Sequence, residues 1–179
     1  MIALFLFALA ADPHVIIETS LGEIEVVVQA QKAPLTASNF LRYVKQHHYD
    51  QGRFHRTVRM DNQPQSKIKI EVIQGGPAAG TPQFPPVALE RTSLTGLKHR
   101  DGVISMARDG PDTATADFFI CIGAQPSLDF GGLRNPDGQG FAAFGYVVRG
   151  MEVVQRIHRM PVTLQKLTPP VEILRMSVR

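Results

Sequence analysis

The sequence predicts a mainly β protein, in which an antiparallel β-barrel closes on itself and two α-helices cover its ends. Three observations predict this fold: many short apolar or alternating runs, only two segments with helical periodicity, and Gly, Pro and Asp turns between them. The chain has 179 residues, of which 44% are hydrophobic and 20% charged, enough for one globular core. No repeat, linker or low-complexity segment divides it, so residues 11–179 are expected to form one domain.

The expected strands begin with a hairpin, because two alternating runs flank the turn Ser20-Leu21-Gly22. A short strand is expected around residues 54–56. The polar, turn-rich residues 60–67 should extend a second hairpin outside the active site, with the alternating run 67–73 as its returning strand. The complete set of expected strands covers 15–19, 23–28, 54–56, 67–73, 102–107, 118–122, 141–148 and 171–178.

Two segments have helical periodicity. Pro34 occupies a favourable first-turn position, and the apolar residues that follow it recur with a period of 3.6 until about residue 47. The second helix is expected over residues 151–157, directly after Gly150. Residues 77–96 and 131–140 are rich in Gly and Pro and are expected to be loops.

The first ten residues carry a signal for export. Residues 2–10 are apolar but too few to span a bilayer, and Ala8-Leu9-Ala10 resembles a signal-peptidase site. We therefore expect residues 1–10 to be a signal peptide, Ala11 to begin the mature chain, and the protein to be periplasmic or exported. The alternative is a cytoplasmic protein in which this segment is a buried first strand or follows a misassigned start codon.

Composition argues against several other classes of function. The formal net charge is +3 and the basic residues are scattered, so no nucleic-acid partner is expected. Cys121 lies in an apolar run and is expected to be a buried, inert thiol. His47 and His48 are adjacent on the expected helix and do not share a face, so they predict no metal site. We expect a monomer that has no cofactor and, once mature, no membrane association.

Five short segments follow one another along the chain: Phe54-His55-Arg56, Gln74-Gly75-Gly76, Ser105-Met106-Ala107-Arg108, Asp117-Phe118-Phe119-Ile120 and Phe144-Gly145-Tyr146-Val147. In this order and spacing they resemble the signature segments of the cyclophilins, most closely those of the bacterial single-domain branch. The resemblance runs from about residue 15 to residue 178. It implies an eight-stranded closed barrel capped by two helices. It also implies peptidyl-prolyl cis/trans isomerase activity on proline-containing polypeptides. Together with the export signal, this predicts an enzyme that assists the folding of exported proteins.

The same resemblance implies the residues of the site. Arg56 matches the catalytic arginine of the family, and Gln74 matches the glutamine that hydrogen-bonds the substrate backbone. The expected substrate-binding residues are the pocket floor Phe119, the wall residues Leu128 and Val72, the peptide-pairing segment Ala107 and Arg108, and Phe141 on the rim. Val72 stands where a methionine is usual, and Phe141 where a histidine is usual. His55, next to Arg56 on a strand, is expected to point to the opposite face and serve in packing.

Isomerisation needs no covalent chemistry. The peptide bond resists rotation by about 18–20 kcal/mol because resonance gives it partial double-bond character. A guanidinium that donates to the prolyl nitrogen favours the twisted state, in which that resonance is lost. Retention of Arg56, Gln74 and Phe119 together therefore favours an enzyme. The alternative is a non-catalytic module that binds proline-containing segments, which Glu71 favours because many members have an aromatic residue there.

Overall fold

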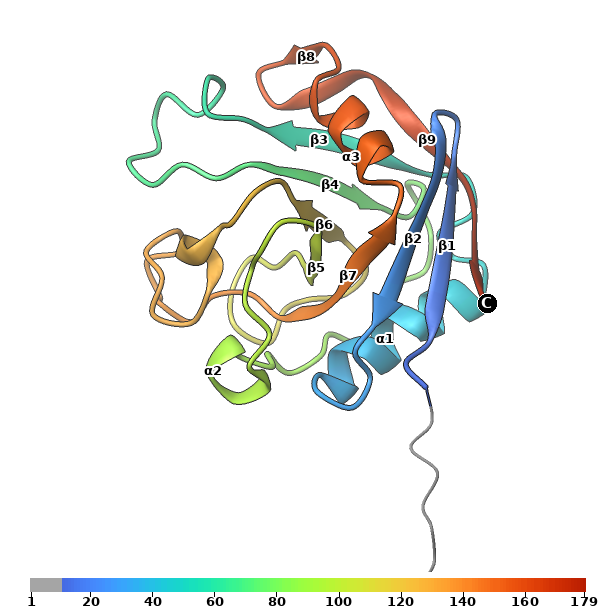
Figure 1. Cartoon of the computed structure of the whole chain (residues 1–179), viewed down its shortest axis with the longest axis horizontal. Coiled ribbons are helices and arrows are strands. Elements are labelled where there is room, and N and C mark those ends of the chain that lie inside the picture. Colours follow the sequence, from blue (N-terminus) through green and yellow to red (C-terminus); the bar gives the residue numbers. More distant parts are fainter. Residues whose placement is uncertain (1–10) are drawn as a thin grey trace, which may run out of the picture.

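The structure, a computed structural model, describes residues 11–179, so the expected signal peptide over residues 1–10 lies outside the described residues. Eight strands form a closed antiparallel barrel in the order β1-β2-β7-β5-β6-β4-β3-β9, and pairing of β9 with β1 closes it (Figure 1). The strands are β1 (His14–Thr19), β2 (Gly22–Val28), β3 (Gly52–Val58), β4 (Val72–Gly76), β5 (Val103–Met106), β6 (Phe118–Cys121), β7 (Ala143–Arg149), β8 (Val162–Thr163) and β9 (Lys166–Val178). The two-residue β8 pairs only with β9 and lies outside the barrel.

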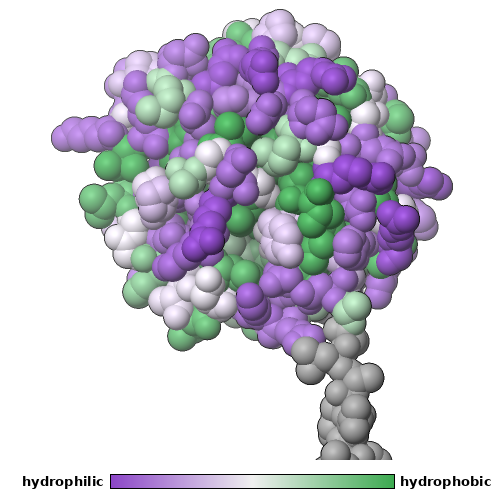
Figure 2. Space-filling model, in the orientation of Figure 1, coloured by the Kyte–Doolittle hydropathy of each residue, from purple (hydrophilic) through white to green (hydrophobic). Residues whose placement is uncertain are grey.

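Two helices cover the ends of the barrel, as expected (Figure 1). In α1 (Pro34–Lys45), Phe40 packs its ring against Phe118 and Phe144, with ring centroids 5.7 and 4.9 Å away. In α3 (Met151–His158), the apolar stripe that contains Val154 is buried against the barrel. Hydrophilic residues dominate the face drawn in Figure 2, with apolar residues in small groups, because the large apolar side chains are packed inside.

Two short helical turns were not expected: one lies inside the expected loop 77–96, and the other lies in residues 123–130, for which the sequence predicted no element. The helix α2 (Thr92–Thr95) ends at Gly96, whose φ of 71° is the left-handed conformation that glycine adopts readily. A 3-10 turn, η1 (Pro126–Leu128), begins at a proline. One turn of helix is too short to show a 3.6-residue period, so periodicity could not reveal either of them.

The alternating run over residues 67–73 is not a strand before Val72, so that prediction is wrong. The buried side chain of Gln63 takes the place of a partner strand: its Nε2 donates to Ile70 O at 2.7 Å, and its Oε1 accepts from Ile70 N at 3.2 Å. A second bond from Nε2 to Arg59 O, 2.7 Å, closes the segment. Residues 59–71, hereafter the 59–71 loop, are therefore held by side-chain hydrogen bonds, above all those of Gln63, rather than by a hairpin ladder.

Candidate active site

A cavity of about 410 Å³ opens beside strands β3, β4 and β6. All of the predicted site residues line it: Arg56, Val72, Gln74, Ala107, Arg108, Phe119, Leu128 and Phe141. Residues far apart in the sequence therefore meet in one place, as the resemblance implied. The lining also includes residues that sequence reasoning did not single out: Ile70, Asp109, Thr113, Thr115, Asp117, Arg134 and Asn135.

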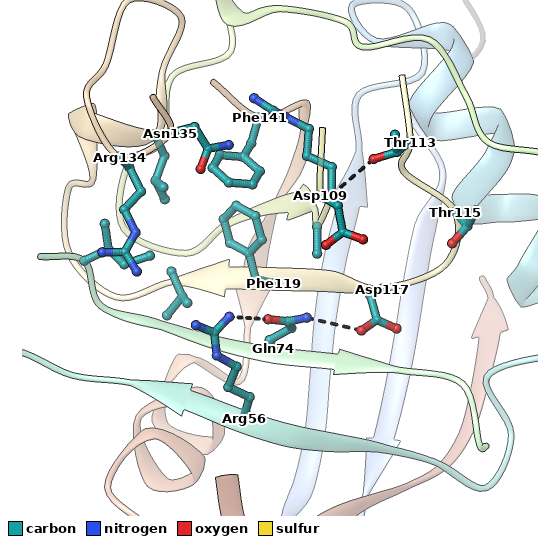
Figure 3. A pocket seen from close by; sticks show the side chains of 15 residues that line it. Arg56, Gln74, Asp109, Thr113, Thr115, Asp117, Phe119, Arg134, Asn135 and Phe141 are labelled. Atoms are coloured by element: carbon teal, nitrogen blue, oxygen red, sulfur yellow. Dashed lines mark hydrogen bonds between the residues drawn. The ribbon is translucent and has the colours of Figure 1, made fainter. Parts of the chain in front are cut away.

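The part of the cavity around Phe119 is apolar. Neighbouring residues on β6 point to opposite faces, so Phe118 packs in the main core while Phe119 belongs to a second apolar cluster with Val72 and Leu128. Phe119 is 5% exposed, and its ring meets the Phe141 ring edge-on, with centroids 5.3 Å apart. Figure 3 shows these two rings at the centre of the cavity. Such a surface accepts a small apolar ring and leaves it no hydrogen-bond partner.

A buried polar cluster supports this floor from behind. The His99 ring stacks on Phe119 with an interplanar angle of 15° and centroids 6.0 Å apart. His99 Nδ1 lies 2.8 Å from Asp129 Oδ1, and its Nε2 lies 3.0 Å from Ser105 Oγ. The Nδ1–H tautomer, with Ser105 donating to Nε2, satisfies both contacts. All three residues are buried, so this Ser-His-Asp arrangement can hold the floor in place but cannot meet a substrate.

The charge of Asp129 follows from the same cluster. Burial alone would raise the pKa of its carboxyl, but hydrogen bonds from the ring and the backbone N–H of His99 outweigh burial, so the pKa lies below its usual value. The carboxylate is therefore ionised at neutral pH and remains a strong acceptor for both His99 donors.

A chain of hydrogen bonds forms the polar edge of the cavity (Figure 3). Arg56 NH1 donates to Gln74 Oε1 at 2.9 Å, and Gln74 Nε2 donates to Asp117 Oδ2 at 3.2 Å. Gln165 Oε1 accepts from both Nε and NH2 of Arg56, at 2.9 and 2.6 Å. Burial lowers the pKa of Arg56, and the charge of Arg134 lowers it further, but an arginine stays protonated at neutral pH. The site thus holds an oriented cation next to an apolar pocket.

His55 is half-buried and does not simply point to the face opposite Arg56, as the alternation of a regular strand predicted. Phe54 pairs with Gly75 while Arg56 pairs with Gln74, which leaves His55 as the extra residue of a β-bulge. Its Nε2 lies 3.6 Å from Asp117 Oδ2, the same oxygen that Gln74 contacts. The bulge breaks the alternation of faces, and so the side chains of His55 and Arg56 reach the same polar edge.

The side chain of Arg108 is committed to structure. It donates to both carboxylate oxygens of Asp137, at 2.8 and 3.0 Å, and to Gly140 O, and its guanidinium lies 5.0 Å from the Phe141 ring centroid. These contacts tie the loop that carries Phe141 to the end of β5. The hydrogen bond from Arg108 also holds the pKa of Asp137 below its usual value. Ala107 N already donates to Asp117 O at 2.8 Å, so a peptide paired here would use other backbone groups of this segment.

Comparison with known proteins agrees with this geometry. Residues 14–178 match the family model described as cyclophilin type peptidyl-prolyl cis-trans isomerase/CLD. The chain belongs to the cyclophilin family. It is 36% identical over 159 residues to peptidyl-prolyl cis-trans isomerase A of Dickeya dadantii, covering 86% of this chain and 75% of that protein. It is 34% identical over 150 residues to a Streptomyces antibioticus isomerase, covering 79% and 80%.

Solved structures of the same fold are also similar. A cyclophilin type isomerase of Cryptosporidium parvum, crystallised in the presence of the dipeptide Ala-Pro, superposes with a TM-score of 0.74 and covers 93% of this chain and 98% of its own. The sequence identity is 22%, so this likeness concerns the fold. The solved structure agrees with the eight-stranded barrel. The family match and the curated relatives identify this cyclophilin as a peptidyl-prolyl cis-trans isomerase.

Glu71, which favoured a binding module, does not line the cavity of this cyclophilin. Its carboxylate lies 3.9 Å from His158 Nε2, and its backbone oxygen accepts from Ile122 N at 2.9 Å. Residues 60–67 also lie outside the cavity lining, although Ile70 of the same loop belongs to it. Arg134, which lines the cavity, donates to Ser66 Oγ and to Ile68 O, and so connects the 59–71 loop to the site.

The single cysteine is shielded from reaction. Cys121 is buried, and burial raises the pKa of its thiol. Within residues 11–179, no group of three or more His, Cys, Asp or Glu side chains is placed to hold a metal. In the same residues, no helix is both long enough and apolar enough to cross a bilayer.

Proposed function

We propose that Arg56 is the catalytic residue of this cyclophilin and that Gln74 binds the backbone of its substrate. In this proposal the proline ring enters the apolar part of the cavity over Phe119, between Leu128, Val72 and Phe141, and the preceding residue pairs with the backbone near Ala107 and Arg108. The observation that carries the proposal is the oriented guanidinium beside that apolar part of the cavity.

The proposed step is rotation about the bond that precedes proline. In the planar ground state the nitrogen lone pair is delocalised, and the nitrogen is a poor acceptor. As the bond twists, the lone pair becomes localised and accepts a hydrogen bond from Arg56. Because this interaction exists mainly in the twisted state, it lowers the barrier rather than merely binding the substrate. An arginine suits this role, since it stays charged and presents several donors in one plane.

The test separates an isomerase from a module that only binds. The cis/trans exchange of a short X–Pro peptide is measured by NMR with and without the protein, beside its affinity by calorimetry. The proposal expects exchange much faster than the uncatalysed tens to hundreds of seconds. A protein that binds the peptide and leaves the exchange rate unchanged would overturn the catalytic role of Arg56.

We also propose that the clients are exported polypeptides, that residues 1–10 are a signal peptide, and that the mature protein works in the periplasm. The support is the apolar segment that ends in Ala8-Leu9-Ala10 ahead of Asp12-Pro13. Mass spectrometry of the protein from its native cells should find a first residue at or near Ala11. A cytoplasmic protein that retains Met1 would contradict this proposal.

A further inference from the structure

Gln165 lies in the turn that joins β8 and β9, far in sequence from the proposed catalytic residue. Arg56 pairs with Lys166 in the β3–β9 ladder, which brings Gln165 beside the guanidinium. The side-chain oxygen of Gln165 accepts from Arg56 Nε at 2.9 Å and from Arg56 NH2 at 2.6 Å. One oxygen therefore holds two donors on the same edge of the guanidinium.

Gln165 is itself held from two other directions. Its backbone oxygen accepts from Thr57 N at 2.9 Å, which fixes its main chain to β3. Its side-chain Nε2 donates to Asn62 O at 3.1 Å, which fixes its amide to the 59–71 loop. The amide cannot turn without losing either the bond to Asn62 or those to Arg56, so the acceptor oxygen has a defined position.

These contacts decide which arginine donors remain for a substrate. Of the five N–H groups of a guanidinium, Gln165 takes one on Nε and one on NH2, and Gln74 takes one on NH1. Arginine has a long side chain with about 2 kcal/mol of rotamer entropy when free. The side-chain oxygens of Gln165 and Gln74 bind different edges of the guanidinium and so fix the orientation of its plane. The direction of the remaining N–H donors is then fixed as well.

We propose that Gln165 is a positioning residue of the isomerase reaction, which holds the Arg56 guanidinium in the plane needed to donate to the prolyl nitrogen. This inference rests on the proposed function of Arg56. It assigns the 59–71 loop a part in catalysis as well, because the carbonyl of Asn62 orients the amide that holds the arginine. The loop contributes through Gln165 without any of its residues 60–67 lining the cavity.

A double-mutant cycle tests the proposal. Gln165→Met removes the acceptor and keeps the length of the side chain, and the matched control is Leu164→Ala, one residue away and 86% exposed. We expect Gln165→Met to lower kcat/KM by about 10- to 100-fold and to change peptide affinity less than about twofold. In the Arg56→Ala background the same substitution should change kcat/KM less than about twofold, because the group that Gln165 orients is absent.

Four results would overturn it. An equal loss in both backgrounds would show that Gln165 acts on the fold, and a loss no larger than that of Leu164→Ala would show that it does not act on the reaction. A parent protein without isomerase activity would overturn the proposed function along with this inference. If Gln165→Met does not fold, the parent protein is tested instead, by the NMR signal of its Arg56 Nε–H. The proposal expects one resolved signal that is protected from exchange with water. A signal that exchanges rapidly with water would contradict the proposal.

Discussion

Replacing Asp129 with alanine removes the oxygen that accepts two hydrogen bonds from His99, one from its backbone N–H at 3.0 Å and one from its ring at 2.8 Å. Both donors are buried, and a buried donor without a partner costs about 1–3 kcal/mol. The free energy of unfolding should therefore fall by about 2–5 kcal/mol. For a chain of this size, that corresponds to a melting temperature lower by about 5–15 °C.

Acid should remove the part of this stabilisation that depends on the negative charge of Asp129. The pKa of Asp129 is lower in the folded protein than in the unfolded chain, so its contribution is complete above the unfolded value of about 4 and is lost as pH falls through the folded value. The stability difference between parent and Asp129→Ala should therefore be constant near neutral pH and shrink below about pH 4.

Asp129→Asn is the matched control for this prediction. It keeps an acceptor oxygen and loses the charge. Its loss in the free energy of unfolding should therefore be less than half of the loss caused by Asp129→Ala. Thermal unfolding followed by circular dichroism, from pH 3 to pH 7, measures all three proteins. The reasoning is refuted if Asp129→Ala lies within about 1 kcal/mol of the parent at pH 7, or if asparagine costs as much as alanine.

Three further predictions follow from the same structure. Phe119→Ala should lower the free energy of unfolding by about 3–5 kcal/mol. It should also weaken peptide binding and lower the isomerisation rate together, because the floor of the cavity contacts the peptide in both the ground state and the transition state. Unchanged affinity in calorimetry would contradict the pocket assignment. Cys121 should not react with a thiol reagent until urea unfolds the chain, since its thiol is buried with a raised pKa; rapid labelling of the native protein would disagree. Gly76→Ala places a methyl group against the carboxylate of Asp117 and should lower kcat/KM several-fold by displacing the partner of Gln74; a rate equal to the parent would show that Asp117 does not orient Gln74.

Most of the barrel could be predicted from local pattern. The apolar runs around Ile104 and Ile120 are strands because they are short, bounded by turn residues and buried. The 67–73 run failed because alternation shows which residues could pair, not whether a partner strand is present. There the amide of Gln63 takes the backbone partners that a strand would have supplied.

The residues that line the site could be predicted from the order of the five signature segments. The residues that hold those side chains in place could not. Gln165 contacts Arg56 because of the register between β3 and β9. Neither segment alone predicts that register. Asp129 and His99 are 30 residues apart, and only the fold places them under Phe119. His55 was misplaced because a single extra residue in β3 reverses the expected faces.

The most direct test of the central claim compares the parent protein with Arg56→Ala, with Arg56→Lys beside them. Exchange of an X–Pro peptide is measured by NMR and peptide affinity by calorimetry. We expect Arg56→Ala to lower kcat/KM by about 100- to 1,000-fold, equivalent to about 3–4 kcal/mol of transition-state stabilisation, with far less change in affinity. Lysine should recover only part of the rate, because it keeps the charge without the planar donors. An Arg56→Ala protein that isomerises the peptide as fast as the parent would contradict the account.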